Sequence, residues 1–155
     1  MSIQTTEDPL QLIEDALSVI VRRVQLPKVH ERMLARAGLS LDRALTVVLS
    51  RIGELGPLRL SELAQVLAVD VSTASRQAAS LERAGFVARE LHPDDARSAL
   101  LSLTPKGRTA LQRLRRARRE ATEELFAHWT EKDRRRLGEL LDRFAREFAA
   151  HTDKL

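Results

Sequence analysis

A pair of short helices separated by a break of a few residues is the sequence feature that most constrains this chain. The segment SELAQVLAVDVSTASRQAASLERAG, residues 61–85, carries apolar residues at three- and four-residue spacings on both sides of a break at Ala68–Asp70. Ser61 is placed to cap the first helix and Asp70 the second, and Gly85 is placed to end the pair. The pattern predicts a helix–turn–helix whose inward faces share six apolar residues: Leu63, Leu67, Val71, Ala74, Ala78 and Leu81.

The outward face of the second helix is polar. At about 100° per residue, the face opposite the apolar stripe presents hydroxyls and arginines, with two more polar residues on its flanks. Short hydroxyls at a helix start, followed by Arg and Gln, can approach phosphates and reach base edges in a major groove. By composition alone, the solvated face of an ordinary amphipathic helix is an equally good interpretation. The candidate DNA-binding residues here are Ser72, Thr73, Arg76, Ser80 and Arg83, with Ser75 and Gln77 on the flanks.

A predicted β-hairpin follows the helix pair and favours the DNA-binding interpretation. Residues 86–90 and 99–103 read as short strands, and the loop between them contains a proline, two aspartates and Arg97. A helix–turn–helix followed by a two-stranded ribbon is a winged helix–turn–helix, and this loop is then the tip of the wing. Arg97 at that tip suits the narrow, electronegative minor groove, and Asp94 or Asp95 can hold its side chain through an ion pair.

Helices are also predicted before the winged segment. Apolar residues at helical spacing indicate a helix over residues 9–36, which Pro27 bends or interrupts and Gly38 ends. Ser40 is placed to cap a following helix over residues 40–54.

Two further helices are predicted after the wing. Thr104 and Pro105 provide a capping hydroxyl followed by proline at the first helical position, and this helix runs to about His128. Thr130 then caps a last helix that ends near Thr152. The buried side of the first of these helices is expected to come from Leu111, Leu114, Ala117, Ala121 and Leu125.

The helix after the wing also carries five arginines between residues 113 and 125. Arg116 and Glu120 lie four residues apart, as do Arg119 and Glu123, which is typical of a solvated, ion-paired helix face. We therefore favour an ion-paired surface over a direct DNA contact for this cluster.

Composition excludes several classes of function. The length of 155 residues suits one domain, residues 1–155, and the absence of cysteine excludes disulfides, thiolate catalysis and Cys-ligated zinc. Aromatic residues make up only 3% of the chain, which disfavours stacking on single-stranded nucleic acids. The chain has no catalytic or nucleotide-binding motif, and His92 beside two aspartates is a weak metal pattern. No enzyme activity, metal site or cofactor is expected.

The positive charge is concentrated in the body of the chain. Residues 1–21 hold four acidic residues and no Lys or Arg, so the remainder carries a formal charge of +8 within a total of +4. A basic body suits a polyanionic partner. The acidic start lacks the basic region of a signal peptide, and no apolar run approaches the roughly 18 residues of a membrane span. A cytoplasmic protein without a membrane partner is expected.

The segment from Leu60 to Gly107 resembles the DNA-binding core of the MarR family of bacterial transcription regulators. The wing motif of that family, Asp-x-Arg followed by a strand and Leu-Thr-x-x-Gly, is similar to Asp95-Ala96-Arg97 and Leu103-Thr104-Pro105-Lys106-Gly107. The family pattern that closes the recognition helix, Leu-x-x-x-Gly and a hydrophobic residue, matches Leu81–Phe86. The flanking helices agree with the family in number and placement.

The resemblance implies a mainly α fold with a small β-hairpin wing. It implies that residues 40–104 form the winged helix–turn–helix lobe and that residues 9–36 and 105–152 form a helical dimerisation region. It implies a homodimer that reads a pseudo-palindrome in double-stranded DNA, with half-sites about one helical turn apart. The terminal helices also favour a partner chain over packing only on each other, because both carry apolar stripes: Leu10, Ile13, Leu17, Ile20, Val21 and Val24, and Leu137, Leu140, Leu141, Phe144 and Phe148.

The resemblance also implies an effector, because many relatives change their DNA affinity when a small, often aromatic and anionic, molecule binds between the dimer helices and the DNA-binding lobe. The candidate effector residues are His30, Met33, Arg36 and Trp129, each of which has a core or interface role as its alternative. The absence of cysteine excludes the peroxide-sensing branch of the family.

The function expected is therefore a sequence-specific, DNA-binding repressor that an effector releases by shifting its conformational population. An effector-independent regulator or an activator is the alternative. A winged helix used for protein docking is more remote, because a docking face would be apolar or acidic, unlike the face that carries Ser72, Thr73, Arg76 and Arg83.

Overall fold

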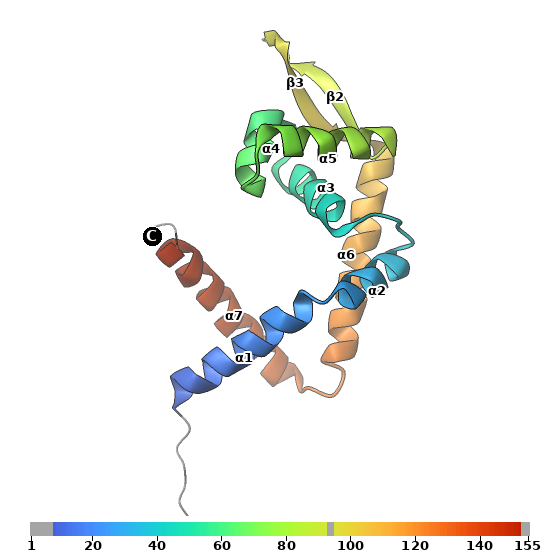
Figure 1. Cartoon of the computed structure of the whole chain (residues 1–155). Coiled ribbons are helices and arrows are strands. Elements are labelled where there is room, and N and C mark those ends of the chain that lie inside the picture. The colour runs from blue at the N-terminus through green and yellow to red at the C-terminus, as the bar shows by residue number, and fades with distance from the viewer. Residues whose placement is uncertain (1–7, 93–94, 153–155) are drawn as a thin grey trace, which may run out of the picture. The chain divides into compact units, whose positions relative to one another are not determined.

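The computed structural model describes residues 8–92 and 95–152, together with the side chains of all these residues except 91, 92 and 95–98. Helices dominate, and a small antiparallel sheet lies beside α5 (Figure 1). In chain order the elements are α1 (Pro9–Val24), α2 (Pro27–Ala37), α3 (Arg43–Leu55), β1 (Leu58–Arg59), α4 (Leu60–Leu67), α5 (Val71–Arg83), β2 (Val87–His92), β3 (Asp95–Leu103), α6 (Pro105–Leu125) and α7 (Glu131–Thr152).

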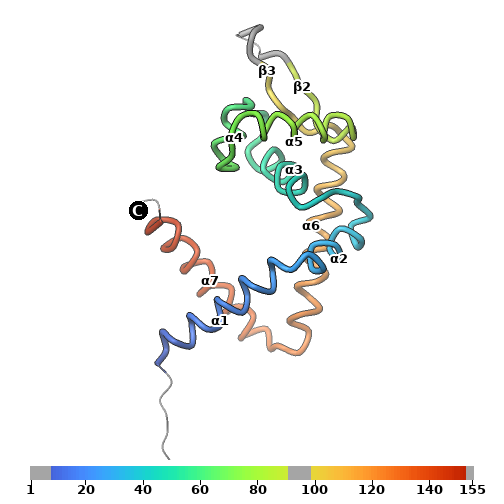
Figure 2. Tube along the Cα trace, in the orientation of Figure 1, coloured from blue at the N-terminus to red at the C-terminus, as the bar shows by residue number. Residues whose placement is uncertain are grey.

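The chain divides into two compact units, Met1–Ala117 and Arg118–Leu155, and the boundary lies within α6. The first unit contains α1–α5, the sheet and the first part of α6. The second unit contains the end of α6 and α7, and Figure 2 traces the backbone through both.

The predicted interruption near the N-terminus is confirmed, because Pro27 is the first residue of α2 and α1 ends at Val24. Gly38 ends α2 in the left-handed conformation, with φ at 63°, as predicted. The predicted cap at Ser40 is wrong. Asp42 caps α3 instead, because its carboxylate accepts a 2.7 Å hydrogen bond from the Leu45 amide and the helix begins only at Arg43.

The first helix of the pair begins one residue earlier than predicted. The Glu62 carboxylate turns back and accepts a 2.6 Å hydrogen bond from the backbone N–H of Arg59, the residue before the helix. Leu60 is therefore the first residue of α4, and the predicted capping role of Ser61 is wrong. Both strands of the hairpin are confirmed and are longer than predicted.

The hydrophobic core of the first unit joins the helix pair to α3 and the sheet. The sheet has the order β1-β3-β2, all antiparallel, and Leu58 of β1 lies opposite Leu101 of β3. The two-residue strand β1, which the sequence analysis did not predict, thus widens the hairpin on the side of α4. The largest fully buried side chains are Leu49, Ile52, Leu63, Leu81, Leu101, Leu114 and Val48.

Two residues predicted to be buried are exposed. Val71 is 52% exposed because it is the first residue of α5, ahead of the turn at which Ala74 enters the core. Leu125 is 71% exposed because it is the last residue of α6, beyond Ala117, the last residue of that helix to be buried. The buried side predicted for α6 is confirmed at Leu111 and its neighbours Leu114 and Ala117.

The terminal helices bury none of their residues in the isolated chain. This holds for α1 and for α7, which begins with the predicted cap: the Thr130 hydroxyl accepts a 3.1 Å hydrogen bond from the Asp133 amide. Phe144 and Phe148 stack on each other along α7, with ring centroids 5.8 Å apart. Over residues 8–92 and 95–152, no helix combines the length and the apolar character that a membrane span requires.

Candidate nucleic-acid interface

The N-terminus of α5 is organised by an exposed carboxylate. One carboxylate oxygen of Asp70 accepts a 2.7 Å hydrogen bond from the Thr73 amide and another hydrogen bond from the Ser72 hydroxyl. The other accepts a 2.7 Å hydrogen bond from the Thr73 hydroxyl. These hydrogen bonds, the one from Ser72 foremost, hold the pKa of Asp70 well below its usual range. The predicted cap is confirmed, and its carboxylate stays negatively charged at physiological pH.

Two arginines follow on the exposed face of α5, and each is held by a hydroxyl. Arg76 donates from Nη2 to the Thr73 hydroxyl at 3.0 Å, and Arg83 donates from Nη2 to the Ser80 hydroxyl at 3.1 Å. The Ser80 hydroxyl in turn donates to the Arg76 carbonyl oxygen at 3.0 Å. In the part of the chain that the structure describes, neither guanidinium is paired with a carboxylate, so most of its N–H donors stay available to a ligand.

The one acidic residue within α5 is neutralised from the wing. Arg89 of β2 donates from Nε to both carboxylate oxygens of Glu82, at 2.9 and 3.0 Å. The pair is partly exposed, so its contribution to stability is small. The pair neutralises the negative charge of Glu82, and it links β2, the first strand of the wing, to α5. Sequence spacing did not reveal this pair, since its members lie on different elements.

The two flanking residues on α5, Ser75 and Gln77, are less exposed than Arg76 and Arg83. Ser75 is half-buried. Gln77 is also half-buried, and its amide oxygen is buried without a hydrogen-bond partner among the described residues. Gln77 lines a shallow hollow of about 360 Å³ with Arg43, Ala44, Val47, Leu67 and Val69. Part of its side chain therefore faces α3 and the turn of the helix pair rather than the exposed face of α5.

The residues that follow α5 fix its position against α6. Gly85 has φ at 76°, which ends the helix, and its carbonyl accepts a 2.7 Å hydrogen bond from the Thr104 hydroxyl. The same hydroxyl accepts from the Gly107 amide at 3.0 Å and so caps α6. Lys106 donates to the Ala84 carbonyl at 2.6 Å, and its ammonium lies 4.7 Å from the centre of the Phe86 ring. The Leu-Thr-x-x-Gly sequence thus joins the end of α5 to the start of α6.

The wing itself is described in part. Its base is regular: Val87 lies opposite Leu103, and the Ser102 hydroxyl donates to the Glu90 carboxylate at 3.1 Å. Asp95 and Arg97 belong to β3, but their side chains, like Asp94 as a whole, lie outside the described part.

The candidate effector residues fall in both units. His30, Met33 and Arg36 lie on α2 in the first unit, where Met33 packs against the buried Leu34 and its cluster. The Nε2 atom of His30 is buried without a hydrogen-bond partner among the described residues. Trp129 lies in the second unit, 45% exposed, and its ring meets the Phe126 ring edge-on at 5.1 Å.

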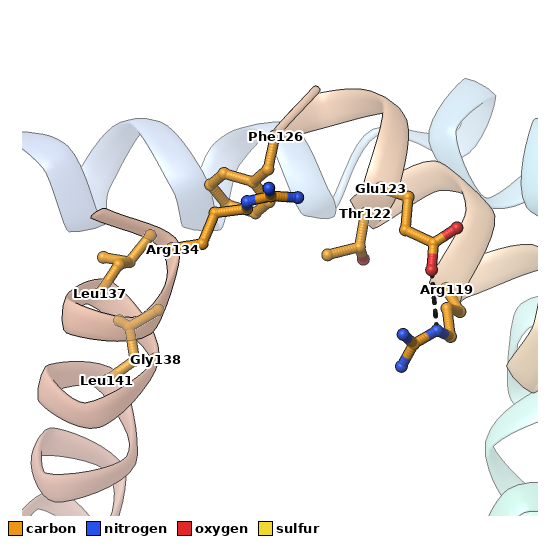
Figure 3. Close-up of a pocket in the computed structure, with 8 residues that line it drawn as sticks. All are labelled: Arg119, Thr122, Glu123, Phe126, Arg134, Leu137, Gly138 and Leu141. Atoms are coloured by element: carbon orange, nitrogen blue, oxygen red, sulfur yellow. Dashed lines mark hydrogen bonds and ion pairs between the residues drawn. The ribbon is translucent and has the colours of Figure 1, made fainter. Parts of the chain in front are cut away.

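The second unit has a hollow of its own between the end of α6 and α7 (Figure 3), which the sequence analysis did not predict. Its volume is about 510 Å³. Arg119 and Glu123 form a 2.8 Å ion pair at one side of it, which confirms that this part of the arginine cluster is ion-paired. The lining residues are Arg119, Thr122, Glu123, Phe126, Arg134, Leu137, Gly138 and Leu141.

Comparison with known proteins places this geometry among transcription regulators. The sequence pattern of the MarR family matches residues 41–99, which include both helices of the pair and most of the wing. YxaD of Bacillus subtilis strain 168, an uncharacterized helix–turn–helix transcriptional regulator, is 34% identical over 92% of this chain and 96% of its own length.

Solved structures agree in fold. The crystal structure of MarR matches 99% of this chain and 100% of that protein, with a TM-score of 0.70 and 26% identity. A MarR family protein from Bacillus stearothermophilus has a TM-score of 0.80 over 90% of this chain and 95% of its own. At 18% identity, the second likeness supports the fold alone. The expected class, mainly α with a small β wing, is confirmed.

Proposed function

This chain belongs to the MarR family of DNA-binding transcriptional regulators, and we propose that it is a homodimeric repressor whose α5 enters the major groove of a pseudo-palindromic operator. The observation that carries the proposal is the exposed face of α5. Its two arginines donate hydrogen bonds to hydroxyls and have no carboxylate partner among the described residues. The acidic Glu82 forms an ion pair with Arg89. A face that is cationic and rich in free donors suits phosphates and the acceptor atoms of base edges.

The DNA contacts we assign lie on two elements. On α5, Arg76 and Arg83 contribute positive charge and donors, and the exposed Ser72 and the half-buried Thr73 and Ser80 complete the face. Ser75 and Gln77, both half-buried, are assigned to its margin. On the wing, we assign Arg97 to the minor groove and Asp95 to orienting it, by resemblance to the wing motif of the family.

Dimerisation is proposed through the terminal helices, residues 9–36 and 105–152, which flank the DNA-binding lobe of residues 40–104 in the sequence. Members of the family act as dimers. In this chain the apolar stripes of α1 and α7 are exposed: Ile13 and Ile20 are 49% and 53% exposed, and Leu141 is 48% exposed. Apolar faces of this size on helices without a fully buried residue are expected to be covered by a partner, because their exposure to water is unfavourable.

Release from DNA is proposed to follow binding of a small, anionic aromatic effector. His30 supports this site, because its Nε2 atom is buried without a hydrogen-bond partner among the described residues and is therefore a polar group that a ligand can satisfy. Met33, Arg36 and Trp129 are the other candidates. An effector acts by favouring the conformations in which the two α5 helices do not fit the operator. We assign no catalytic activity, and we place the protein in the cytoplasm with the DNA that it binds.

The test of this proposal is a DNA-binding experiment. The full-length protein is mixed at low salt with a random-site library and with the DNA that flanks its own gene. Selection of an inverted repeat with half-sites about one helical turn apart is the expected result. Failure to bind either DNA at low salt would contradict the assignment of α5 as a reading element. A transcription assay from the selected operator, with and without the protein, distinguishes repressor from activator.

A further inference from the structure

The two hydroxyl groups at the start of α5 share one hydrogen-bond acceptor, the Asp70 carboxylate. A carboxylate can only accept hydrogen bonds, and the Asp70 carboxylate lies within hydrogen-bond distance of the Ser72 and Thr73 hydroxyls. Both hydroxyls must therefore point their protons at Asp70. The Thr73 amide, which would otherwise be free at the helix N-terminus, also donates to Asp70. The Thr73 amide is one of the four N–H groups that a helix start leaves without an intrahelical partner.

The two hydroxyl oxygens differ in whether they accept a hydrogen bond from another residue. The Thr73 oxygen accepts a hydrogen bond from Arg76, so it is engaged on both sides. The Ser72 oxygen is exposed, and no described residue donates to it. Ser72 therefore presents a hydrogen-bond acceptor to a ligand and has no proton left to donate.

Because the Ser72 hydroxyl can accept but not donate, we infer that Ser72 contacts the exocyclic amino group of adenine or cytosine in the major groove. Asp70 is the positioning residue that keeps this hydroxyl an acceptor. The inference rests on the proposed function. Phosphate oxygens only accept, so an acceptor beside a charged carboxylate disfavours them. On the major-groove edges of the base pairs, the hydrogen-bond donors are the N6 amino group of adenine and the N4 amino group of cytosine.

The arrangement also predicts what lies next to that amino group. Arg76 is four residues beyond Ser72, so the two share a helix face and are separated by about 6 Å along the axis. Arg76 offers donors, which suit the N7 and O6 atoms of guanine. Since base pairs are spaced by roughly 3.4 Å, the amino group and the guanine are expected within about two base-pair steps of each other.

The experiment removes single amino groups from the DNA. In the operator selected above, each adenine of one half-site is replaced in turn by purine deoxyriboside, which lacks the N6 amino group. Each cytosine is replaced by the pyrimidin-2-one deoxyriboside, which lacks the N4 amino group. The affinity of each duplex is measured for the parent protein and for Ser72→Ala. Any effect of the replacement on the duplex itself is common to both proteins and cancels in the comparison.

The inference predicts one position at which removal of the amino group lowers the affinity of the parent roughly 3- to 10-fold, the loss expected for one hydrogen bond. At the same position the affinity of Ser72→Ala falls by less than about 2-fold. The base at that position shows whether adenine or cytosine is read. Ser72→Thr, which keeps a hydroxyl, retains the dependence. Asp70→Asn can place its amide oxygen where one carboxylate oxygen accepts from both the Ser72 hydroxyl and the Thr73 amide, so this variant is expected to retain the dependence. Asp70→Ala removes the acceptor of the Ser72 proton and is expected to lose the dependence on the amino group, and circular dichroism checks that this variant is folded.

Failure of this inference is distinct from failure of the proposed function. If the parent selects an operator but every amino-group deletion lowers the affinity of the parent and of Ser72→Ala equally, the role of Ser72 is refuted. The regulator assignment then stands. If Asp70→Ala keeps the full dependence, Asp70 does not position the hydroxyl. If the parent binds no DNA at all, both proposals are overturned.

Discussion

An ideal Cβ atom on Gly107 would lie 2.0 Å from the carbonyl oxygen of Phe86. The backbone at the start of α6 therefore touches the backbone that follows α5, and only glycine fits between them. The Phe86 carbonyl also accepts a 3.0 Å hydrogen bond from the Thr104 amide, which fixes the same contact from the other side. The direction of α5 relative to the start of α6 is thus set by a contact that a side chain would prevent.

Gly107→Ala is predicted to destabilise the protein by about 1–3 kcal/mol, because the methyl group meets backbone that cannot rotate away. Unfolding by urea, followed by circular dichroism, measures the change. The matched control is Gly138→Ala in α7, where a Cβ atom would meet nothing within 4 Å. Alanine is favoured over glycine in a helix, so the control is expected to be neutral or stabilising. Equal stability of Gly107→Ala and the parent would refute the packing argument.

Asp70 predicts a specific dependence of stability on pH. Its pKa is lowered in the folded protein by the hydroxyls of Ser72 and Thr73, so its contribution to stability is complete above the unfolded pKa, near 4. That contribution is lost as the pH falls through the lower folded pKa. Asp70→Ala is therefore less stable than the parent at pH 7, and the difference narrows below about pH 4. Urea unfolding of both proteins at pH 7, 5 and 3 tests this; a difference that stays constant with pH would contradict it.

The terminal helices are predicted to hold a dimer together. Replacing Leu141 and Phe144 with glutamate places charges on an apolar stripe, and burying an unpaired charge is costly. The variant is expected to be monomeric or to aggregate in sedimentation analysis. Glu139→Lys, on another face of α7, is the control and is expected to leave the parent's oligomeric state unchanged. A well-folded monomer for the parent at micromolar concentration would refute the assignment.

Local signals in the sequence were sufficient for much of the fold. The Asp70 and Thr130 caps, the break at Pro27 and the end at Gly38 each depend on neighbouring residues, and all four are present. The two wrong cap predictions, Ser40 and Ser61, lie where two neighbouring residues could each begin the helix. Asp42 and Ser40 both suit a helix start, and so do Ser61 and the turn closed by Glu62. In the structure, Asp42 accepts from the Leu45 amide and Glu62 accepts from the Arg59 amide, and these hydrogen bonds mark the two helix starts.

The parts of the candidate site that the sequence did not predict depend on contacts between elements. Glu82 and Arg89 are seven residues apart on a helix and a strand, so no helical spacing relates them. The exposed face of α5 was predicted residue by residue from periodicity, but the polarity of its hydroxyls was not, because it follows from which atoms Asp70 reaches.

The wing arginine is predicted to act differently from the arginines of α5. In the minor groove little is distinguished beyond A·T against G·C and groove width. Arg97→Ala is therefore expected to weaken binding to many sequences alike and to flatten the salt dependence by roughly one unit of slope. Asp95→Ala is expected to give a milder form of the same loss. Unchanged affinity of Arg97→Ala for the operator would show that the wing does not contact DNA.

The measurement that tests the central claim most directly is the affinity of Arg76→Ala for the operator and for its single-base variants. If α5 reads the major groove, this variant loses about 1–3 kcal/mol of binding free energy and no longer discriminates at one position in each half-site. Arg119→Ala, whose parent residue is paired with Glu123, is the control and is expected to bind with the parent's affinity and base preferences. Parental affinity and parental discrimination in Arg76→Ala would contradict the assignment of α5 as the recognition helix.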